Sequence, residues 1–194
     1  MTAALIVIDV QESFRVRPTW KAVGNQEIGT AVQRLVDAAR AAGDLVVWIL
    51  HAEPGSGTPF DPESGHVRIF AELKPADDEP ILTKTSRNAF TTTNLQQVLT
   101  ERGIRDLTLC GIQTEQCVET TARVGADFGY AITFVTDATT TFPIPHRDAP
   151  ADRSIEEILA DPRTLQVDDI VSRTEYALAG RFATVTSVQE LTGS

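Results

Sequence analysis

The stretch Leu107-Thr108-Leu109-Cys110-Gly111-Ile112-Gln113-Thr114-Glu115-Gln116-Cys117-Val118 decides the fold of this chain. Its apolar run stops at Gly111, a few polar residues follow, and Cys117 opens a segment with helical character. That order predicts a strand, a tight turn and the N-terminus of a helix. A helix N-terminus can lower the pKa of a thiol, so Cys117 is a candidate nucleophile. Cys110 lies inside the apolar run, where we expect an inert core residue.

Short runs rich in β-branched residues alternate with helical patterns along the rest of the chain. Strands are expected at Ala4 to Ile8, Leu45 to Leu50, Ile81 to Thr83, Leu107 to Cys110, Ile132 to Thr136 and Phe182 to Thr186. Helices are expected at Gly29 to Ala42, Asn94 to Arg102, Gln116 to Phe128, Asp169 to Ala179 and Ser187 to Leu191. This alternation predicts an α/β fold, with a mostly parallel sheet covered by helices on both faces.

Two stretches lack this periodicity. Glu53 to Gly65 is rich in Pro, Gly and Ser, which predicts a long surface loop of the kind that often carries function. Phe142 to Asp161 contains several prolines and a run of charges, which predicts an irregular segment with one short helix.

The composition limits the classes of function. With 194 residues and 42% hydrophobic content, the chain can bury a substantial core, and its length suits one domain over residues 1–194. A net charge of -10 argues against nucleic acid or an anionic membrane as a partner. Two cysteines give no disulfide framework and favour the reducing cytoplasm. The apolar N-terminus lacks a basic flank, which indicates a core strand rather than a signal peptide.

Three reactive residues follow expected strands. Asp9 comes directly after the first strand, Lys84 after the third, and Cys117 shortly after the fourth. Ligands of open parallel sheets bind beyond the carboxyl ends of the strands, so these side chains can share a crevice if the first and fourth strands are neighbours. Asp9 would then take the thiol proton, while Lys84 keeps Asp9 ionised. A thiol, a carboxylate and an ammonium group together are suited to acyl transfer through a thioester.

Each of these residues also has a structural interpretation. An Asp after a strand is commonly a turn or cap residue, and a Lys there is usually a solvated side chain. A Cys near a helix start is often a small buried apolar residue. The coincidence of three strand ends favours the catalytic interpretation.

The motifs around these residues resemble those of the isochorismatase-like cysteine hydrolases. Asp9-Val10-Gln11-Glu12-Ser13-Phe14 resembles the family's Asp-x-Gln-x-x-Phe opening, and Lys84 to Phe90 resembles its Lys-x-x-x-Ser-Ala-Phe segment, with Asn88 in place of Ser. Gly111 to Arg123 looks like the signature around the nucleophile. The resemblance implies a three-layer Rossmann-like fold, strand order 3-2-1-4-5-6, and a triad of Asp9, Lys84 and Cys117.

The resemblance also implies the details of a site. A cis peptide bond between Ile112 and Gln113 would turn the Gln113 N–H, beside that of Cys117, toward an oxyanion. The tentative substrate pocket comprises Gln11, Phe14, Phe60, Arg87, Asn88 and Phe90, with Arg87 available for a substrate carboxylate. The three phenylalanines could equally be core, and Arg87 could equally be solvated.

Departures from the subfamilies narrow the chemistry. Metal-binding nicotinamidases carry Asp-x-His near the second strand end, whereas this chain has His51-Ala52-Glu53, so we expect no metal and no cofactor. His51 and His66 are expected in loops or the pocket rather than as ligands. Retention of Cys117 favours an amide, ureido or carbamoyl substrate.

Alternatives to this hydrolase remain open on sequence. The chain could be a non-catalytic small-molecule binding or structural member of the fold, or could cleave a vinyl ether. A redox role is disfavoured because Cys110 and Cys117 lack Cys-x-x-Cys spacing. The expected partner is a small molecule, with no nucleic acid and no membrane, and the family implies a homodimer or homotetramer.

Overall fold

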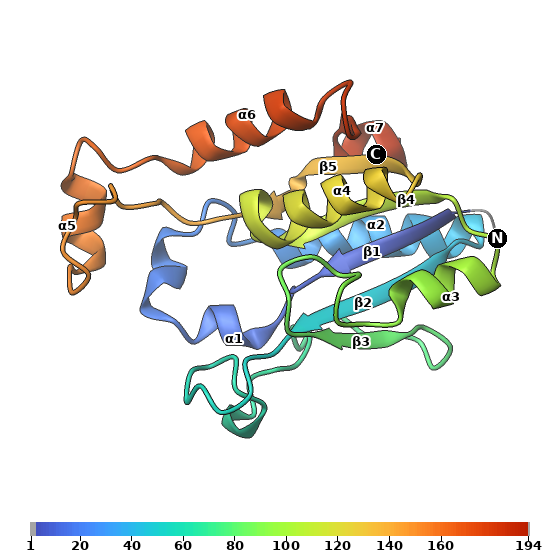
Figure 1. The fold of residues 1–194 in the computed structure, drawn as a ribbon, viewed down its shortest axis with the longest axis horizontal. Coiled ribbons are helices and arrows are strands. Elements are labelled where there is room, and N and C mark those ends of the chain that lie inside the picture. The colour runs from blue at the N-terminus through green and yellow to red at the C-terminus, as the bar shows by residue number, and fades with distance from the viewer. Residues whose placement is uncertain (1–2, 194) are drawn as a thin grey trace.

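The computed structural model describes residues 3–193 and contains one six-stranded sheet (Figure 1). Its strands are β1 Ala3–Ile8, β2 Leu45–His51, β3 Ile81–Lys84, β4 Asp106–Ile112, β5 Ala131–Thr140 and β6 Thr184–Thr186. They lie in the order β3-β2-β1-β4-β5-β6, and every neighbouring pair is parallel. The predicted α/β fold and strand order are therefore confirmed.

The helices follow the predicted pattern with additions near the strand ends. They are α1 Glu12–Arg15, α2 Ile28–Ala42, α3 Leu95–Glu101, α4 Glu119–Asp127, α5 Ile155–Ala160, α6 Val167–Leu178 and α7 Val188–Thr192. Short 3₁₀ turns span Pro18–Ala22 and Pro62–Ser64, and a π-helical turn spans Thr114–Val118. The single helix predicted from Gln116 is thus a π turn followed by α4.

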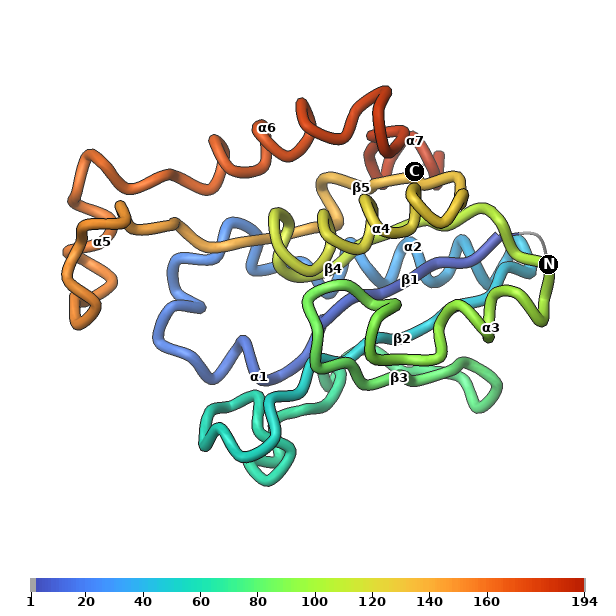
Figure 2. Tube along the Cα trace, viewed as in Figure 1, coloured from blue at the N-terminus to red at the C-terminus, as the bar shows by residue number. Residues whose placement is uncertain are grey.

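Two apolar clusters cover the two faces of the sheet, because successive strand residues point to opposite sides. Ile6 and Ile8 of β1 pack in the cluster that includes residues of α3 and α4. Leu5 and Val7 pack in the other cluster, with residues of α2 and α7. The trace in Figure 2 shows α3 and α4 in front of the sheet and α2 behind it. This is the three-layer arrangement predicted from the sequence.

Every strand differs from its predicted bounds by at least one residue, and the structure shows the cause for β5 and β6. β5 continues to Thr140 instead of Thr136, because a register shift in its pairing with β4 lets Thr139 and Thr140 pair with the end of β4. β6 begins at Thr184 rather than Phe182, because the amide of Phe182 donates to Leu178 O and closes α6. The β5 extension thus depends on a tertiary partner, whereas the later start of β6 depends on the way α6 ends.

The segment between β5 and α6 projects from the body of the molecule, with α5 at its far end (Figure 1). An antiparallel bridge joins Ile144 to Leu165, and Asp161 binds Arg153 at 2.7 Å. Ser154 begins α5 with a capping box. The predicted irregular segment with one short helix is confirmed.

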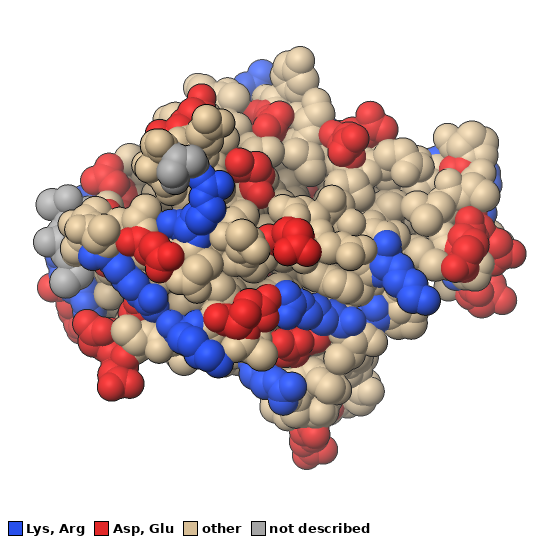
Figure 3. Space-filling view, turned by 180° about the vertical axis from the view of Figure 1, so that it is seen from behind, with Lys and Arg blue, Asp and Glu red and all other residues tan. Residues whose placement is uncertain are grey.

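The molecular surface mixes both signs of charge. On the face in Figure 3, basic side chains are interspersed with acidic ones. Among residues 3–193, no helix combines the length and apolar character required to cross a bilayer.

Candidate active site

The structure brings the three reactive residues together at the carboxyl edge of the sheet. Lys84 Nζ lies 2.7 Å from Asp9 Oδ2 and 3.3 Å from Cys117 Sγ. Asp9 and Lys84 are fully buried, and Cys117 is only 4% exposed. Because β1 neighbours β4, Asp9 and the turn that carries Cys117 lie side by side. Lys84, at the end of the edge strand β3, reaches across the end of β2 to meet them.

The backbone at Asp9 turns the chain out of β1. Asp9 has a φ of 54°, a left-handed conformation that is uncommon for residues other than glycine. Its amide donates to Ile49 O at 2.8 Å, and its carbonyl accepts from the amide of Gln11 at 2.9 Å. These hydrogen bonds hold Asp9 in its uncommon backbone conformation, and such conformations cluster at active sites and ligand-binding sites.

Gly111 allows β4 to approach β1 closely. Its φ is 129°, and a Cβ atom at this position would lie 1.9 Å from the carbonyl oxygen of Ile8. Only glycine fits this position. The Ile112–Gln113 peptide bond that follows is cis, and the turn from Thr114 then carries Cys117 over Asp9.

Burial controls the proton affinities of Asp9 and Cys117. Burial raises the pKa of Asp9, against the opposing effect of the Lys84 ammonium. Burial, followed by the Asp9 charge, raises the pKa of Cys117 to about 12. The sequence analysis named Cys117 a candidate nucleophile because a helix start can lower a thiol pKa, whereas in the structure burial raises the pKa of this thiol. Desolvation outweighs the helix N-terminus because the thiol is buried beside a carboxylate.

The two oxygens of Asp9 have different surroundings. Oδ2 accepts from Lys84, whereas Oδ1 is buried and has no hydrogen-bond partner among residues 3–193. A buried carboxylate oxygen without a donor is an avid proton acceptor. Asp9 can therefore receive the proton of the neighbouring Cys117 thiol.

His51 joins Lys84 to the mouth of the site. Its Nδ1 lies 3.4 Å from Lys84 Nζ, and its Nε2 lies 3.3 Å from Glu53 Oε1. Burial, followed by the Lys84 charge, lowers the pKa of His51, which favours the neutral ring. A neutral ring with Nδ1 as acceptor for Lys84 carries its proton on Nε2, facing Glu53.

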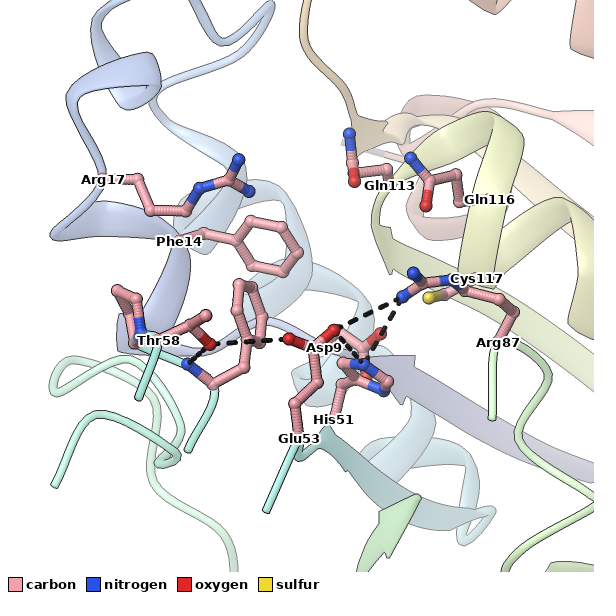
Figure 4. Close-up of a pocket in the computed structure, with 12 residues that line it drawn as sticks. Asp9, Phe14, Arg17, His51, Glu53, Thr58, Arg87, Gln113, Gln116 and Cys117 are labelled. Atoms are coloured by element: carbon pink, nitrogen blue, oxygen red, sulfur yellow. Dashed lines mark hydrogen bonds and ion pairs between the residues drawn. The ribbon is translucent and has the colours of Figure 1, made fainter. Parts of the chain in front are cut away.

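A cavity of about 390 Å³ opens over this site (Figure 4). The residues that line it come from the end of β2, the loops after β2 and β3, and the turns after β1 and β4: Asp9, Phe14, Arg17, His51, Glu53, Thr58, Pro59, Phe60, Arg87, Gln113, Gln116 and Cys117. Phe14, Phe60 and Arg87 thus lie where the sequence analysis expected them. The long loop that begins at Glu53 also contributes, as expected.

Three other residues of the tentative pocket do not line the cavity, and these assignments are corrected. Gln11 is buried beneath it, where its side chain donates to His51 O at 3.0 Å and accepts from His51 N at 2.7 Å. Asn88 caps a turn by accepting from the amides of Phe90 and Thr91, both at 2.9 Å. Phe90 stacks on Tyr130 in the core.

The other histidine named in the sequence analysis also lies outside the cavity. His66 offers its carbonyl oxygen to the Ser13 hydroxyl at 2.9 Å. Between residues 3 and 193, no group of three His, Cys, Asp or Glu side chains is arranged to hold a metal ion.

Sequence reasoning missed Arg17 and Gln116. Arg17 lies between α1 and the following 3₁₀ turn in an extended conformation, and its amide donates to Phe14 O at 3.2 Å. No local pattern marks such a position as part of a pocket. Gln116 lies one residue before Cys117, in a turn whose π-helical course the local sequence pattern does not reveal.

Comparison with known proteins identifies the family. The isochorismatase domain model matches residues 3–165. The chain belongs to the isochorismatase family of hydrolases. YrdC of Bacillus subtilis, an uncharacterized isochorismatase family protein, is 31% identical over 139 residues, which cover 72% of this chain and 74% of YrdC. Streptothricin hydrolase of Streptomyces noursei is 33% identical over 144 residues, which cover 73% of this chain and 56% of that protein.

Solved structures of the family share the fold. The crystal structure of an isochorismatase from Pseudomonas putida KT2440 aligns with a TM-score of 0.82 and 28% identity. The alignment covers 97% of this chain and 89% of that structure.

Proposed function

We propose that this isochorismatase-family protein is a cysteine hydrolase that cleaves a C–N bond in a small amide, ureide or carbamoyl compound. The observation that carries the proposal is the position of Lys84 Nζ, within 3.3 Å of both Asp9 and Cys117 beneath the cavity. A thiol, a carboxylate and a cation in contact form the set that acyl transfer requires.

In the acylation step, Asp9 Oδ1 takes the thiol proton as Cys117 Sγ attacks the carbonyl carbon. The C–N bond then breaks, and protonated Asp9 returns the proton to the departing nitrogen. The Lys84 ammonium contacts both Cys117 Sγ and the Asp9 carboxylate, so it stabilises the negative charge on whichever of the two groups is deprotonated. The raised pKa of both acids suits this transfer, because one proton is shared between two buried groups.

The backbone amides of Gln113 and Cys117 are the proposed oxyanion donors in both steps. In deacylation, a water molecule gives a proton to Asp9 and its oxygen attacks the thioester. The acid product leaves, and the proton returns to Cys117 Sγ. The reaction uses no cofactor, and its expected partner is a small molecule.

Two further expectations accompany this proposal. The chain functions in the cytoplasm, and it assembles into a homodimer or homotetramer as other members of the family do. A hydrolase among the relatives, the streptothricin hydrolase, supports a hydrolytic reaction.

An ammonia-release screen over small carboxamides, ureides and carbamoyl compounds tests the proposal. We expect turnover of at least one class, and Cys117→Ala should lower kcat at least about a thousandfold because the nucleophile is lost. Cys110→Ala is the matched control, since Cys110 is a buried thiol outside the cavity. Full activity of the Cys117→Ala protein would refute the proposed mechanism.

A further inference from the structure

One cation in the cavity, Arg17, has no anionic partner among residues 3–193. The other charged side chains of the site pair off, Lys84 with Asp9 at 2.7 Å and Arg87 with Glu53 at 4.0 Å. Arg17 lines the same cavity and forms no salt bridge with any side chain of residues 3–193. The charges near the cavity therefore leave Arg17 as an uncompensated positive group.

The surroundings of Arg17 fit a ligand better than bulk water. Its guanidinium lies 5.9 Å from the Phe142 ring centroid and is partly buried. In Figure 4, Arg17 and Phe14 lie on the side of the cavity opposite Cys117, and the amide groups of Gln113 and Gln116 face the space between them. A partly desolvated guanidinium at one end of a cavity attracts an anion to that end.

We propose that Arg17 binds a carboxylate at the end of the substrate remote from the carbonyl carbon that Cys117 attacks. The inference rests on the proposed function and names its substrate class, which is small amides or ureides that carry a carboxylate. A guanidinium presents paired N–H donors that match the two oxygens of a carboxylate. The cavity of about 390 Å³ restricts the ligand to a small molecule.

Arg87 is less suited to this role, although the sequence analysis considered it. Its side chain is 57% exposed, and its NH1 lies 4.0 Å from Glu53 and 3.4 Å from His51. Glu53 already balances the charge of this guanidinium. Arg87 and Glu53 together bring no net charge to the cavity, so the attraction for an anion comes from Arg17.

Paired substrates that differ only in charge test the inference by kinetics. Succinamate and N-carbamoylglycine are compared with their methyl esters, using the unchanged protein, Arg17→Gln and the control Arg147→Gln, whose side chain is 88% exposed. We expect the unchanged protein and the control to prefer the carboxylates. Arg17→Gln should lower kcat/KM for the carboxylates about 10-fold to 100-fold, mainly through KM, and leave the esters unchanged.

Binding without turnover separates this inference from the proposed function. Calorimetry measures succinamate and its methyl ester against Cys117→Ala and against the Arg17→Gln, Cys117→Ala double variant. We expect the Arg17 substitution to weaken succinamate binding at least tenfold and to leave ester binding unchanged. If that holds while no compound is hydrolysed by the unchanged protein, the proposed function fails but the carboxylate site at Arg17 stands. Equal affinity for succinamate and its ester in both proteins, or no binding of succinamate at millimolar concentration, overturns the inference.

Discussion

Asp9 has two carboxylate oxygens with separate tasks. Oδ2 is held by the Lys84 ammonium at 2.7 Å, and Oδ1 has no donor among the described residues. The ionised carboxylate also raises the pKa of Cys117 by its charge. In the proposed mechanism, the same residue therefore both disfavours the thiolate by its charge and accepts the thiol proton.

Asp9→Asn should separate these two tasks. Removal of the Asp9 charge leaves Lys84 as the charged neighbour of Cys117, so the pKa of Cys117 should fall from its value of about 12. The rate of iodoacetamide labelling of Cys117 at pH 7 to 8 should rise, while turnover should fall at least about a hundredfold because the base is absent. Peptide mapping by mass spectrometry and an ammonia assay measure the two effects.

Asp148→Asn is the control for this experiment, because Asp148 lies outside the cavity and its side chain is 66% exposed. It should change neither rate. Slower labelling of Cys117 in Asp9→Asn would contradict the assigned electrostatics, and unchanged turnover would contradict the assigned base.

The sequence identified the three reactive residues because each follows an apolar run. It did not predict the raised pKa of Cys117, because burial and the closeness of Asp9 arise only when β1 and β4 lie side by side. It included Phe90 in the pocket because aromatic residues near strand ends serve both cores and pockets. Only tertiary packing against Tyr130 distinguishes the two.

At the scale of elements, the turn between β4 and α4 depends on one close backbone approach. A Cβ atom on Gly111 would lie 1.9 Å from Ile8 O, and the residue has a φ of 129°. The end of β4 and the turn that carries Cys117 are therefore built around a residue without a side chain.

Gly111→Ala should prevent stable folding, or lower the free energy of unfolding by more than about 4 kcal/mol, because neither backbone can move without breaking the β1–β4 pairing. Gly43→Ala is the matched control, since Gly43 also has a positive φ of 74° but has nothing within 4 Å of its Cβ position. Its cost should be about 1 to 2 kcal/mol. Urea denaturation followed by circular dichroism measures both, and equal losses would contradict the close approach.

Element positions were predictable where apolar periodicity is strong, as in β1, β2 and α2. The extension of β5 to Thr140 and the π turn at Thr114 were not predictable. The β5 extension depends on the shifted register between β4 and β5, and the π turn follows the end of β4. The local amino-acid composition predicts neither feature.

At the scale of the whole molecule, Lys84 ties the edge of the sheet to its centre. It extends from β3 to Asp9 after β1 and to Cys117 after β4, and it is fully buried. The strand order that permits these contacts followed from the family resemblance, because composition and periodicity do not order parallel strands.

Lys84→Met should lower the free energy of unfolding by about 3 to 5 kcal/mol at pH 8, because Asp9 is left buried without a counter-charge. The loss should shrink as the pH falls toward 5. Without Lys84, the buried Asp9 of the folded variant binds a proton at a pH where the unfolded chain does not, so proton uptake stabilises the folded state.

Urea denaturation at several pH values measures this dependence. Lys74→Met is the control, since Lys74 is exposed and its loss should change stability by less than about 0.5 kcal/mol at each pH. A Lys84→Met deficit that grows on acidification would contradict the assigned burial of Asp9.

The central claim is a covalent thioester on Cys117, and acid-quenched mass spectrometry during turnover tests it most directly. With a substrate from the ammonia-release screen, the account predicts a mass increase equal to the acyl group, mapped to the peptide that contains Cys117. The adduct should persist in Cys110→Ala and be absent from Cys117→Ala, which should also be inactive. Undiminished turnover by Cys117→Ala, or an acyl group found on a different residue, would contradict the account.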